Sequence, residues 1–141
     1  MGSAQAMRGM VAEYMHLQKL FLEFCADAKR ALPTDNSYGI EIGTAKRNAC
    51  DLTILDHPCR IRFDVRTEPP PMLGKLIFER LLPEDQTRCL WTLYFDRLGN
   101  ADEAPDPMTR LSTLKGSDIV NFEAVRLLES FFKDIAPNPT A

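Results

Sequence analysis

The sequence has little of what cofactor-dependent enzymes, membrane proteins and disulfide-stapled proteins carry. Of its 141 residues only two are histidines, and its four cysteines stand far apart, at positions 25, 50, 59 and 89. Cysteines this few and this scattered do not form a disulfide framework. No apolar run approaches the roughly 20 residues that a membrane-spanning helix needs. We therefore expect a cytoplasmic protein with reduced thiols that does not enter membranes.

A surplus of basic residues is also lacking. The 17 Lys and Arg residues are outnumbered by 20 Asp and Glu, so the net charge is −3 at pH 7. Nucleic-acid binding depends largely on neutralising phosphates with Lys and Arg. The glycines Gly39 and Gly43 stand outside any phosphate-loop pattern. We therefore predict no nucleic-acid partner and no cofactor.

Two amphipathic segments predict a helix at each end of the chain. In residues 7–32 apolar side chains recur every three or four positions and form a wide stripe. A stripe of this width suits a helix that lies on a sheet or in a dimer seam. A second helix is predicted from Ser117 or Asp118 to about Ile135. Residues 1–6 receive no role, and we expect them to be disordered or to derive from an expression vector.

Between the two helices the apolar pattern alternates as it does in strands. Strands are predicted over residues 38–43, 49–55, 60–66, 74–82 and 88–96. The connections between them are short, which favours antiparallel neighbours in a meander. An acidic loop without regular structure is predicted over 101–116. The chain is thus expected to be a single α+β domain, residues 1–141, with a sheet of about five antiparallel strands.

The stretch 88–96 is predicted to be the central strand, with apolar groups on both faces. Its odd positions are apolar, namely Cys89, Trp91, Leu93 and Phe95. Its even positions, Leu90, Thr92 and Tyr94, form the second face. We expect the helices to cover the odd face. The even face is left without an assigned cover, so we expect any binding function to lie there.

No motif of a catalytic or metal site is strong enough to name a chemistry. Asp56, His57 and Cys59 lie close together, with Cys50 across the same hairpin, and such groups are ligands that zinc accepts. Both cysteines, however, are in phase with the apolar positions of their strands. We therefore favour packing over metal binding or nucleophilic catalysis, and we predict no metal site and no catalytic residues.

The outer positions of the strand 60–66 are rich in arginine. Arg60, Arg62 and Arg66 would suit an anionic ligand, although a solvated face with Asp64 interleaved explains them as well. The prolines at 69–71 resemble a polyproline ligand, but a rigid connector between two strands is the commoner explanation. We favour the plainer explanation for both features.

Two helices are too few to cover both faces of the expected sheet, which favours a binding protein over an enzyme. With both helices on one face, the other face would expose an apolar patch. The predicted binding residues are Leu90, Thr92, Tyr94, Ile77, Leu81, Arg60 and Arg62. We predict a protein-binding module of chaperone, immunity or adaptor type, most simply a homodimer through this face, with another protein as a further partner. The alternative is a small-molecule-binding or enzymatic domain with a pocket lined by Trp91, Tyr94, Phe78 and Phe63.

The size, the acidity and the long amphipathic N-terminal helix resemble small bacterial type III secretion chaperones. Such chaperones dimerise and hold an effector segment against their surface. The resemblance covers element order and composition. The chain lacks the helix that those chaperones place between their third and fourth strands, because residues 67–73 are too few and proline-rich. The resemblance therefore implies dimerisation but transfers no site residues. An immunity protein or another small inhibitor has a similar composition.

Overall fold

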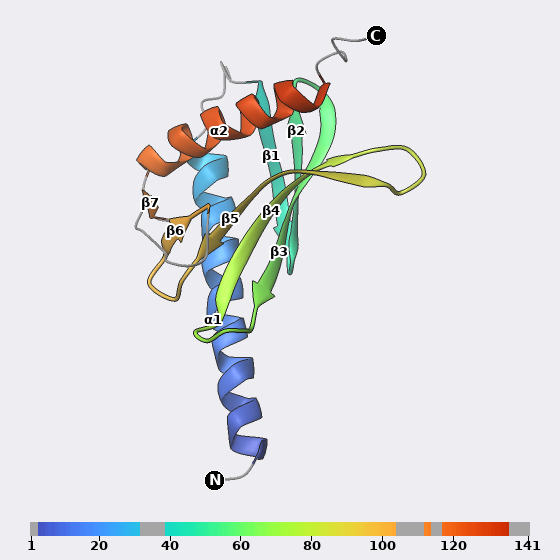
Figure 1. Ribbon diagram of the computed structural model, residues 1–141. Coiled ribbons are helices and arrows are strands. Elements are labelled where there is room, and N and C mark those ends of the chain that lie inside the picture. The colour runs from blue at the N-terminus through green and yellow to red at the C-terminus, as the bar shows by residue number, and fades with distance from the viewer. Residues whose placement is uncertain (1–2, 32–38, 104–111, 114–116, 136–141) are drawn as a thin grey trace.

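The sheet of this protein is a meander in which each strand pairs with the strand that follows it in sequence. The computed structural model describes residues 3–31, 39–103, 112–113 and 117–135. Along these residues the elements are α1 (Ser3–Ala31), β1 (Ile40–Lys46), β2 (Ala49–Ile54), β3 (His57–Arg66), β4 (Leu73–Leu81), β5 (Thr87–Phe95), β6 (Asn100–Asp102), β7 (Ser112–Thr113) and α2 (Ser117–Ile135). The strands lie in the order β1 to β7 and all pairs are antiparallel (Figure 1). The predicted α+β meander between two helices is confirmed.

The five long strands lie where the alternation predicted them, within a few residues at each end. Helix α1 begins at Ser3, so residues 3–6 form its first turn rather than a disordered tail. The predicted loop over 101–116 is wrong at two places, because β6 reaches Asp102 and β7 occupies Ser112 and Thr113. Residue 38 at the start of the first predicted strand, and the rest of that loop apart from residue 103, lie outside the described residues.

The turn between β2 and β3 lies earlier than predicted. Leu55 and Asp56 form it with φ angles of 49° and 69°, and β3 then begins at His57. Two successive left-handed residues are the conformation that a two-residue hairpin turn needs, and Asn and Gly usually supply it. Leu is a rare choice there. The sequence signal for a turn, Asp56 to Cys59, therefore pointed to the wrong residues.

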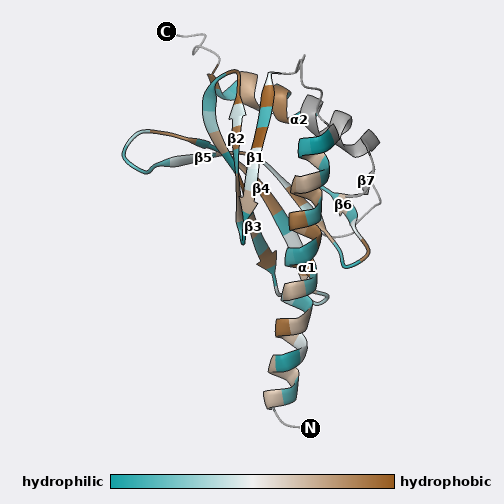
Figure 2. Ribbon diagram, turned by 180° about the vertical axis from the view of Figure 1, so that it is seen from behind, coloured by the Kyte–Doolittle hydropathy of each residue, from teal (hydrophilic) through white to brown (hydrophobic). Residues whose placement is uncertain are grey.

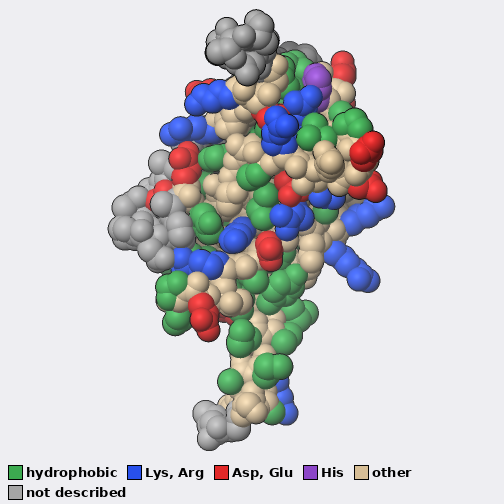
Figure 3. Space-filling view, turned by 45° about the vertical axis from the view of Figure 1, so that its right-hand side comes forward, with side chains coloured by type: hydrophobic (Ala, Val, Ile, Leu, Met, Phe, Trp, Pro, Cys, Tyr) green, Lys and Arg blue, Asp and Glu red, His purple; other side chains and the backbone are tan. Residues whose placement is uncertain are grey.

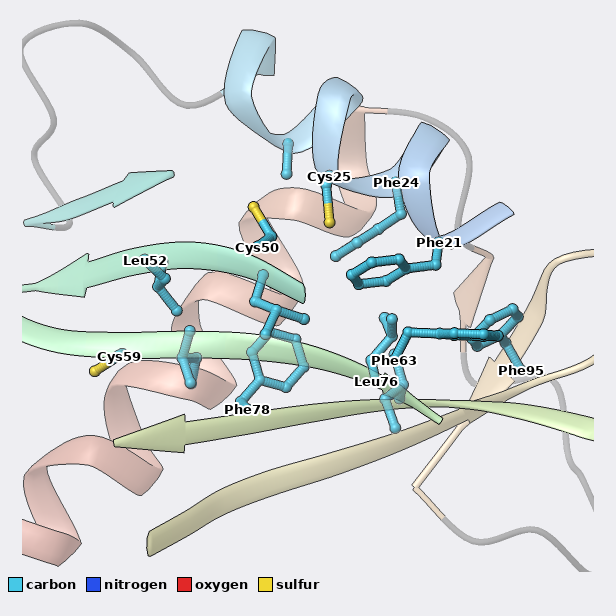
Figure 4. Close-up of a cluster of buried hydrophobic side chains, with 14 of the residues drawn as sticks. Phe21, Phe24, Cys25, Cys50, Leu52, Cys59, Phe63, Leu76, Phe78 and Phe95 are labelled. Atoms are coloured by element: carbon cyan, nitrogen blue, oxygen red, sulfur yellow. The ribbon is translucent and has the colours of Figure 1, made fainter. Parts of the chain in front are cut away.

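Both helices pack on one face of the sheet and enclose the hydrophobic core there. Phe21 of α1 stacks on Phe63 of β3 with ring centroids 5.5 Å apart. Phe131 of α2 is fully buried, and its ring meets His57 edge-on at 5.2 Å. Figure 4 shows the side chains of α1 meeting those of β2, β3 and β4 in a single cluster. Helix α2 crosses the end of the sheet beside the C-terminal half of α1 (Figure 1).

An ion-pair cluster ties α2 to the hairpin formed by β4 and β5. Asp134 accepts hydrogen bonds from Arg80 Nη1 at 2.9 Å and from Arg88 Nη1 at 3.0 Å. Burial acts to raise the pKa of the Asp134 carboxyl, but the hydrogen bonds from Arg80 and Arg88 outweigh it and hold the pKa below its ordinary value. The charged form of Asp134 therefore stabilises the fold.

No helix of the described residues is long and apolar enough to cross a bilayer.

We predict that Gly74→Ala destabilises the protein. Gly74 pairs with Phe95 across β4 and β5, and a methyl group at Gly74 would overlap the fully buried Phe95 ring. Overpacking of this kind costs about 1–3 kcal/mol, which urea unfolding would measure. The matched control is Gly43→Ala, whose new methyl group would lie 3.4 Å from Asp51 and should change stability far less. Equal losses in the two variants would contradict the packing explanation.

We also predict that Asp134→Asn lowers stability by about 1–2 kcal/mol at pH 7, because charge-assisted hydrogen bonds to two arginines are lost. The pKa of Asp134 is lowered on folding, so its contribution is present above the ordinary value of 3.8 and disappears as the pH falls through the lower folded value. The difference between wild type and variant should therefore vanish in acid. Glu129→Gln, on the exposed side of α2, is the control and should be neutral.

Candidate binding surfaces

The sheet face away from the helices, here called the outer face, carries most of the predicted binding residues. Strand register places Arg60 beside Glu79 and Arg62 beside Ile77, while Ile77 and Thr92 are partners across the next pair of strands. Lys75 faces Tyr94 in the same way. The outer face therefore brings together six of the seven predicted residues, namely Arg60, Arg62, Ile77, Leu81, Thr92 and Tyr94.

Leu90 is the exception, because β5 contains a bulge. The register of β4 and β5 shifts after the pair of Phe78 and Trp91, so that Glu79 faces Cys89 and Leu90 is the extra residue. Leu90 packs against the hydrophobic core. Cys89 moves to the outer face, where its Sγ lies 3.5 Å from Thr92 Oγ1. The expected alternation of the central strand is therefore wrong on both counts at this end of β5.

The centre of the outer face is a charged cluster rather than an apolar patch. Arg60 donates hydrogen bonds to Glu79 Oε2 from Nε at 3.2 Å and from Nη2 at 2.8 Å. Arg62 Nε donates to Oε1 of the same carboxylate at 3.1 Å. The Glu79 side chain is only 6% exposed, whereas those of Arg60 and Arg62 are 33% and 39% exposed. Arg60 and Arg62 are thus paired with Glu79 of the neighbouring strand β4.

The apolar residues of the outer face are largely covered by this cluster and its neighbours. Ile77 is buried, Leu81 is half-buried, and the ring of Tyr94 lies under the Lys75 ammonium at 5.8 Å. A hollow of about 310 Å³ lies toward β1, with Glu41, Asp51, Pro58 and Leu81 in its wall. The exposed apolar patch predicted for this face is absent from its described residues.

The predicted aromatic pocket does not form either. Phe78 stacks on Trp91 with centroids 5.3 Å apart, and Phe63 lies in the core between α1 and β3. Tyr94 is on the opposite face of the sheet. These four rings therefore do not line a common cavity.

The residues considered for metal binding or catalysis are mostly packed in the core. Cys50 and Cys59 are buried, and the ring of His57 lies against Phe131. Burial raises the pKa of the Cys59 thiol to about 11, so it stays protonated near neutral pH. Across the described ranges, no three or more His, Cys, Asp or Glu side chains come together as metal ligands would.

The exposed apolar surface lies instead on the first half of α1. Residues 3–16, here called the projecting segment, contain no buried residue, and the first turns of this segment extend past the end of the sheet (Figure 2). Met7, Met10, Val11 and Met15 are 63%, 49%, 57% and 61% exposed. Figure 3 shows hydrophobic side chains along this part of the helix. The wide apolar stripe in the sequence was the signal for this exposed surface. Part of a stripe this wide can face a second molecule while the rest faces the sheet of its own chain.

An apolar groove runs along the base of the projecting segment. Its volume is about 320 Å³. Its walls are Met7, Met10, Val11 and Tyr14 from α1, Val65 from β3, and Thr67 and Met72 from the connection between β3 and β4. A second hollow of about 460 Å³ adjoins it and reaches Glu13, Glu68 and Pro70. Pro70 of the proline-rich segment thus lines this second hollow and not the groove itself. Sequence reasoning did not assign these residues to a site.

No protein-family model, no curated protein and no solved structure matches the chain. The resemblance to type III secretion chaperones therefore stays a prediction from element order and composition. The function is argued below from the outer face and the projecting segment.

We predict that Glu79→Gln destabilises the protein by about 2 kcal/mol, because two partly buried guanidinium groups lose their counter-charge. Chemical denaturation would measure the loss. The control is Asp64→Asn: its carboxylate is 53% exposed and lies 3.7 Å from Arg62, so its loss should cost under about 0.5 kcal/mol. A Glu79→Gln variant as stable as Asp64→Asn would show that the cluster contributes nothing.

Proposed function

We propose that this protein is a non-enzymatic, cytoplasmic protein-binding module that forms a homodimer through the projecting segment of α1. The observation that carries the proposal is the row of exposed apolar side chains at Met7, Met10, Val11 and Met15 beside an apolar groove. Large contiguous apolar surfaces on proteins commonly mark contacts with another macromolecule. The proposal moves the expected dimer interface from the sheet to the helix.

The stability of the projecting segment supports a partner. Its 14 residues would be about 21 Å long at the helical rise, and isolated helices of this length are marginal in water. Gly9 weakens it by roughly a further 1 kcal/mol relative to alanine. Tyr14, near the end of this segment, contacts Phe63 of the sheet, whereas Met7, Met10, Val11 and Met15 remain exposed. Packing of these four side chains against another molecule would add the stability that intrinsic helix propensity does not.

A second copy of the chain fits this surface in shape. A two-fold interface uses the same patch on both partners, so the patch must hold both projections and a hollow. Met7, Val11 and Met15 project, and the groove beside Met10 and Met72 is hollow. Methionine side chains adapt well to such a groove because they are unbranched and flexible.

The charges of the projecting segment also favour a second copy. Arg8 and Glu13 are the only Lys, Arg, Asp or Glu residues of the segment, and their charges are opposite. A helix that lies on a membrane surface usually has several Lys or Arg residues on its polar face, and this segment has only Arg8. A lipid surface is therefore the weaker candidate.

The size of the apolar surface sets the expected strength of the dimer. Burying four half-exposed side chains gains roughly 1 kcal/mol for each, or about 8 kcal/mol for two copies. Association itself costs about 4 kcal/mol or more, so about 4 kcal/mol remains, which corresponds to a Kd near 1 mM. We therefore expect a dimer that dissociates on dilution. In this arrangement Arg60, Arg62 and Tyr94 on the outer face remain available to a second protein, as an adaptor or chaperone would need.

We predict that Met10→Glu weakens the dimer by at least about 100-fold, because it places two like charges at the centre of an apolar interface. At millimolar concentration, sedimentation equilibrium should find the average mass of the wild type rising from the chain mass of 16.0 kDa toward twice that value, while the variant stays near the chain mass. Glutamate is a good helix former, so circular dichroism should show α1 retained.

The control is Leu55→Glu, which changes an exposed apolar side chain in the turn between β2 and β3 and should leave the dimer intact. A wild-type chain that stays monomeric up to about 1 mM, where only very weak association remains undetected, would refute the proposal. Binding of that monomer to anionic phospholipid vesicles would assign the surface to lipid instead.

A further inference from the structure

We infer that hydrogen peroxide weakens the self-association of this protein by oxidising the methionines of the projecting segment to sulfoxides. The inference rests on the proposed dimer and assigns a means of regulation to that same surface. The chain has six methionines. The four that lie in the described residues all belong to the projecting segment or to the groove beside it, namely Met7, Met10, Met15 and Met72.

These methionines lie on a surface that solvent already reaches. Met7, Met10 and Met15 are 63%, 49% and 61% exposed, so a small oxidant meets them without any opening of the fold. Met72 is half-buried, and together with Met10 it lines both the groove and the second hollow. Figure 3 shows the hydrophobic side chains of this part of the helix at the surface of the molecule. Oxidation therefore takes place on the folded protein.

Oxidation at these positions changes the proposed interface and leaves the core intact. Within the described ranges no methionine is among the buried core side chains, and Met72 packs against the core from outside it. A sulfoxide is polar, and burying its oxygen in an apolar contact costs free energy unless the oxygen accepts a hydrogen bond. A two-fold interface uses the same patch on both partners, so each oxidised position is present twice. The sulfoxides therefore oppose association more than they oppose folding.

Each oxidation consumes one hydrogen peroxide. The thioether sulfur attacks one peroxide oxygen, so that the S–O bond forms and the O–O bond breaks. The departing hydroxide takes up the proton of the transferred oxygen and leaves as water. Two electrons pass from sulfur to peroxide, and methionine sulfoxide reductases reverse the change.

One substitution removes the competing oxidation of an exposed thiol. Cys89 is exposed, whereas Cys25, Cys50 and Cys59 are buried. Peroxide oxidises accessible thiols as well as thioethers. All measurements therefore use the Cys89→Ser chain.

The first measurement is the oxidation rate of each methionine, which peptide mass spectrometry follows as a gain of about 16 Da. With a Kd near 1 mM, about two-thirds of the chains are paired at about 3 mM and very few at about 0.03 mM. Met7, Met10 and Met15 should therefore oxidise about three-fold more slowly at the higher concentration, because the second copy covers them. Added N-acetylmethionine reports the peroxide concentration in both samples. Equal rates in a chain that associates would place the interface elsewhere and refute both the proposed dimer and the inference.

The second measurement is sedimentation equilibrium of the chain oxidised at Met7, Met10 and Met15. Its Kd should be at least about 10-fold higher than that of the untreated chain, because several polar oxygens enter each interface. Reductases for both sulfoxide epimers should restore the original Kd. The melting temperature should change by less than about 3 °C, because these three side chains lie outside the core. A larger fall would show that oxidation acts through unfolding and would overturn the inference.

A variant with leucine at the three exposed positions tests whether these methionines carry the effect. Met7→Leu, Met10→Leu and Met15→Leu together keep the surface apolar and remove the three sulfur atoms. The variant is compared only with itself, and its Kd should be the same before and after peroxide. If it fails to fold, reversal by the reductases on the Cys89→Ser chain decides.

The outcomes distinguish a failure of the inference from a failure of the proposed function. An untreated chain that does not associate at about 3 mM would refute the dimer and the inference with it. An untreated chain that associates with a Kd that peroxide leaves unchanged would overturn the inference alone. A leucine variant that loses association on peroxide treatment would also overturn it, because other residues would then carry the effect.

Discussion

The packing of Phe21 against Phe63 is the contact on which the rest of the structure depends. It fixes the C-terminal half of α1 to the middle of the sheet, and Tyr14 adds a second ring to Phe63 at 5.4 Å. Ring pairs of this kind contribute about 0.5–1.5 kcal/mol beyond the area that they bury. Because α1 continues past the end of the sheet (Figure 2), fixing its C-terminal half leaves Met7, Met10 and Met15 of the other half exposed to solvent.

The same one-sided packing explains the chemistry of the outer face. Because both helices lie on one side of the sheet, the charged side chains of the outer face have only one another as partners within the sheet. Strand β4 places Glu79 between Arg60 and Arg62, where it pairs with both. A carboxylate this buried is tolerated because both of its oxygens accept charged hydrogen bonds. The two surfaces of the protein therefore differ in kind: the projecting segment is apolar with balanced charge, and the outer face is polar and ordered.

The sequence predicted elements well and faces less well. Helices and strands were visible because each has its own period of apolar residues, and α1 and the strand of Ile61, Phe63 and Val65 follow theirs cleanly. The errors arose where one residue breaks the period. The bulge at Leu90 exchanged the faces of Cys89 and Leu90, and the left-handed Leu55 moved a turn by one residue. Leucine has no conformational preference that would predict a bulge at position 90 or a left-handed turn at position 55.

Amino-acid order by itself determined the α+β class, the meander, the two helices and the burial of Cys50 and Cys59, because local periodicity and short connections suffice for these. Tertiary structure alone decided that Glu79 pairs with Arg60 and Arg62, and that Met7 and Met15 face solvent while Phe21 does not. The physical reason is that an apolar stripe indicates which side of a helix is suited to burial, but not which part of that side is buried. How far the sheet extends beneath that helix depends on residues distant in sequence.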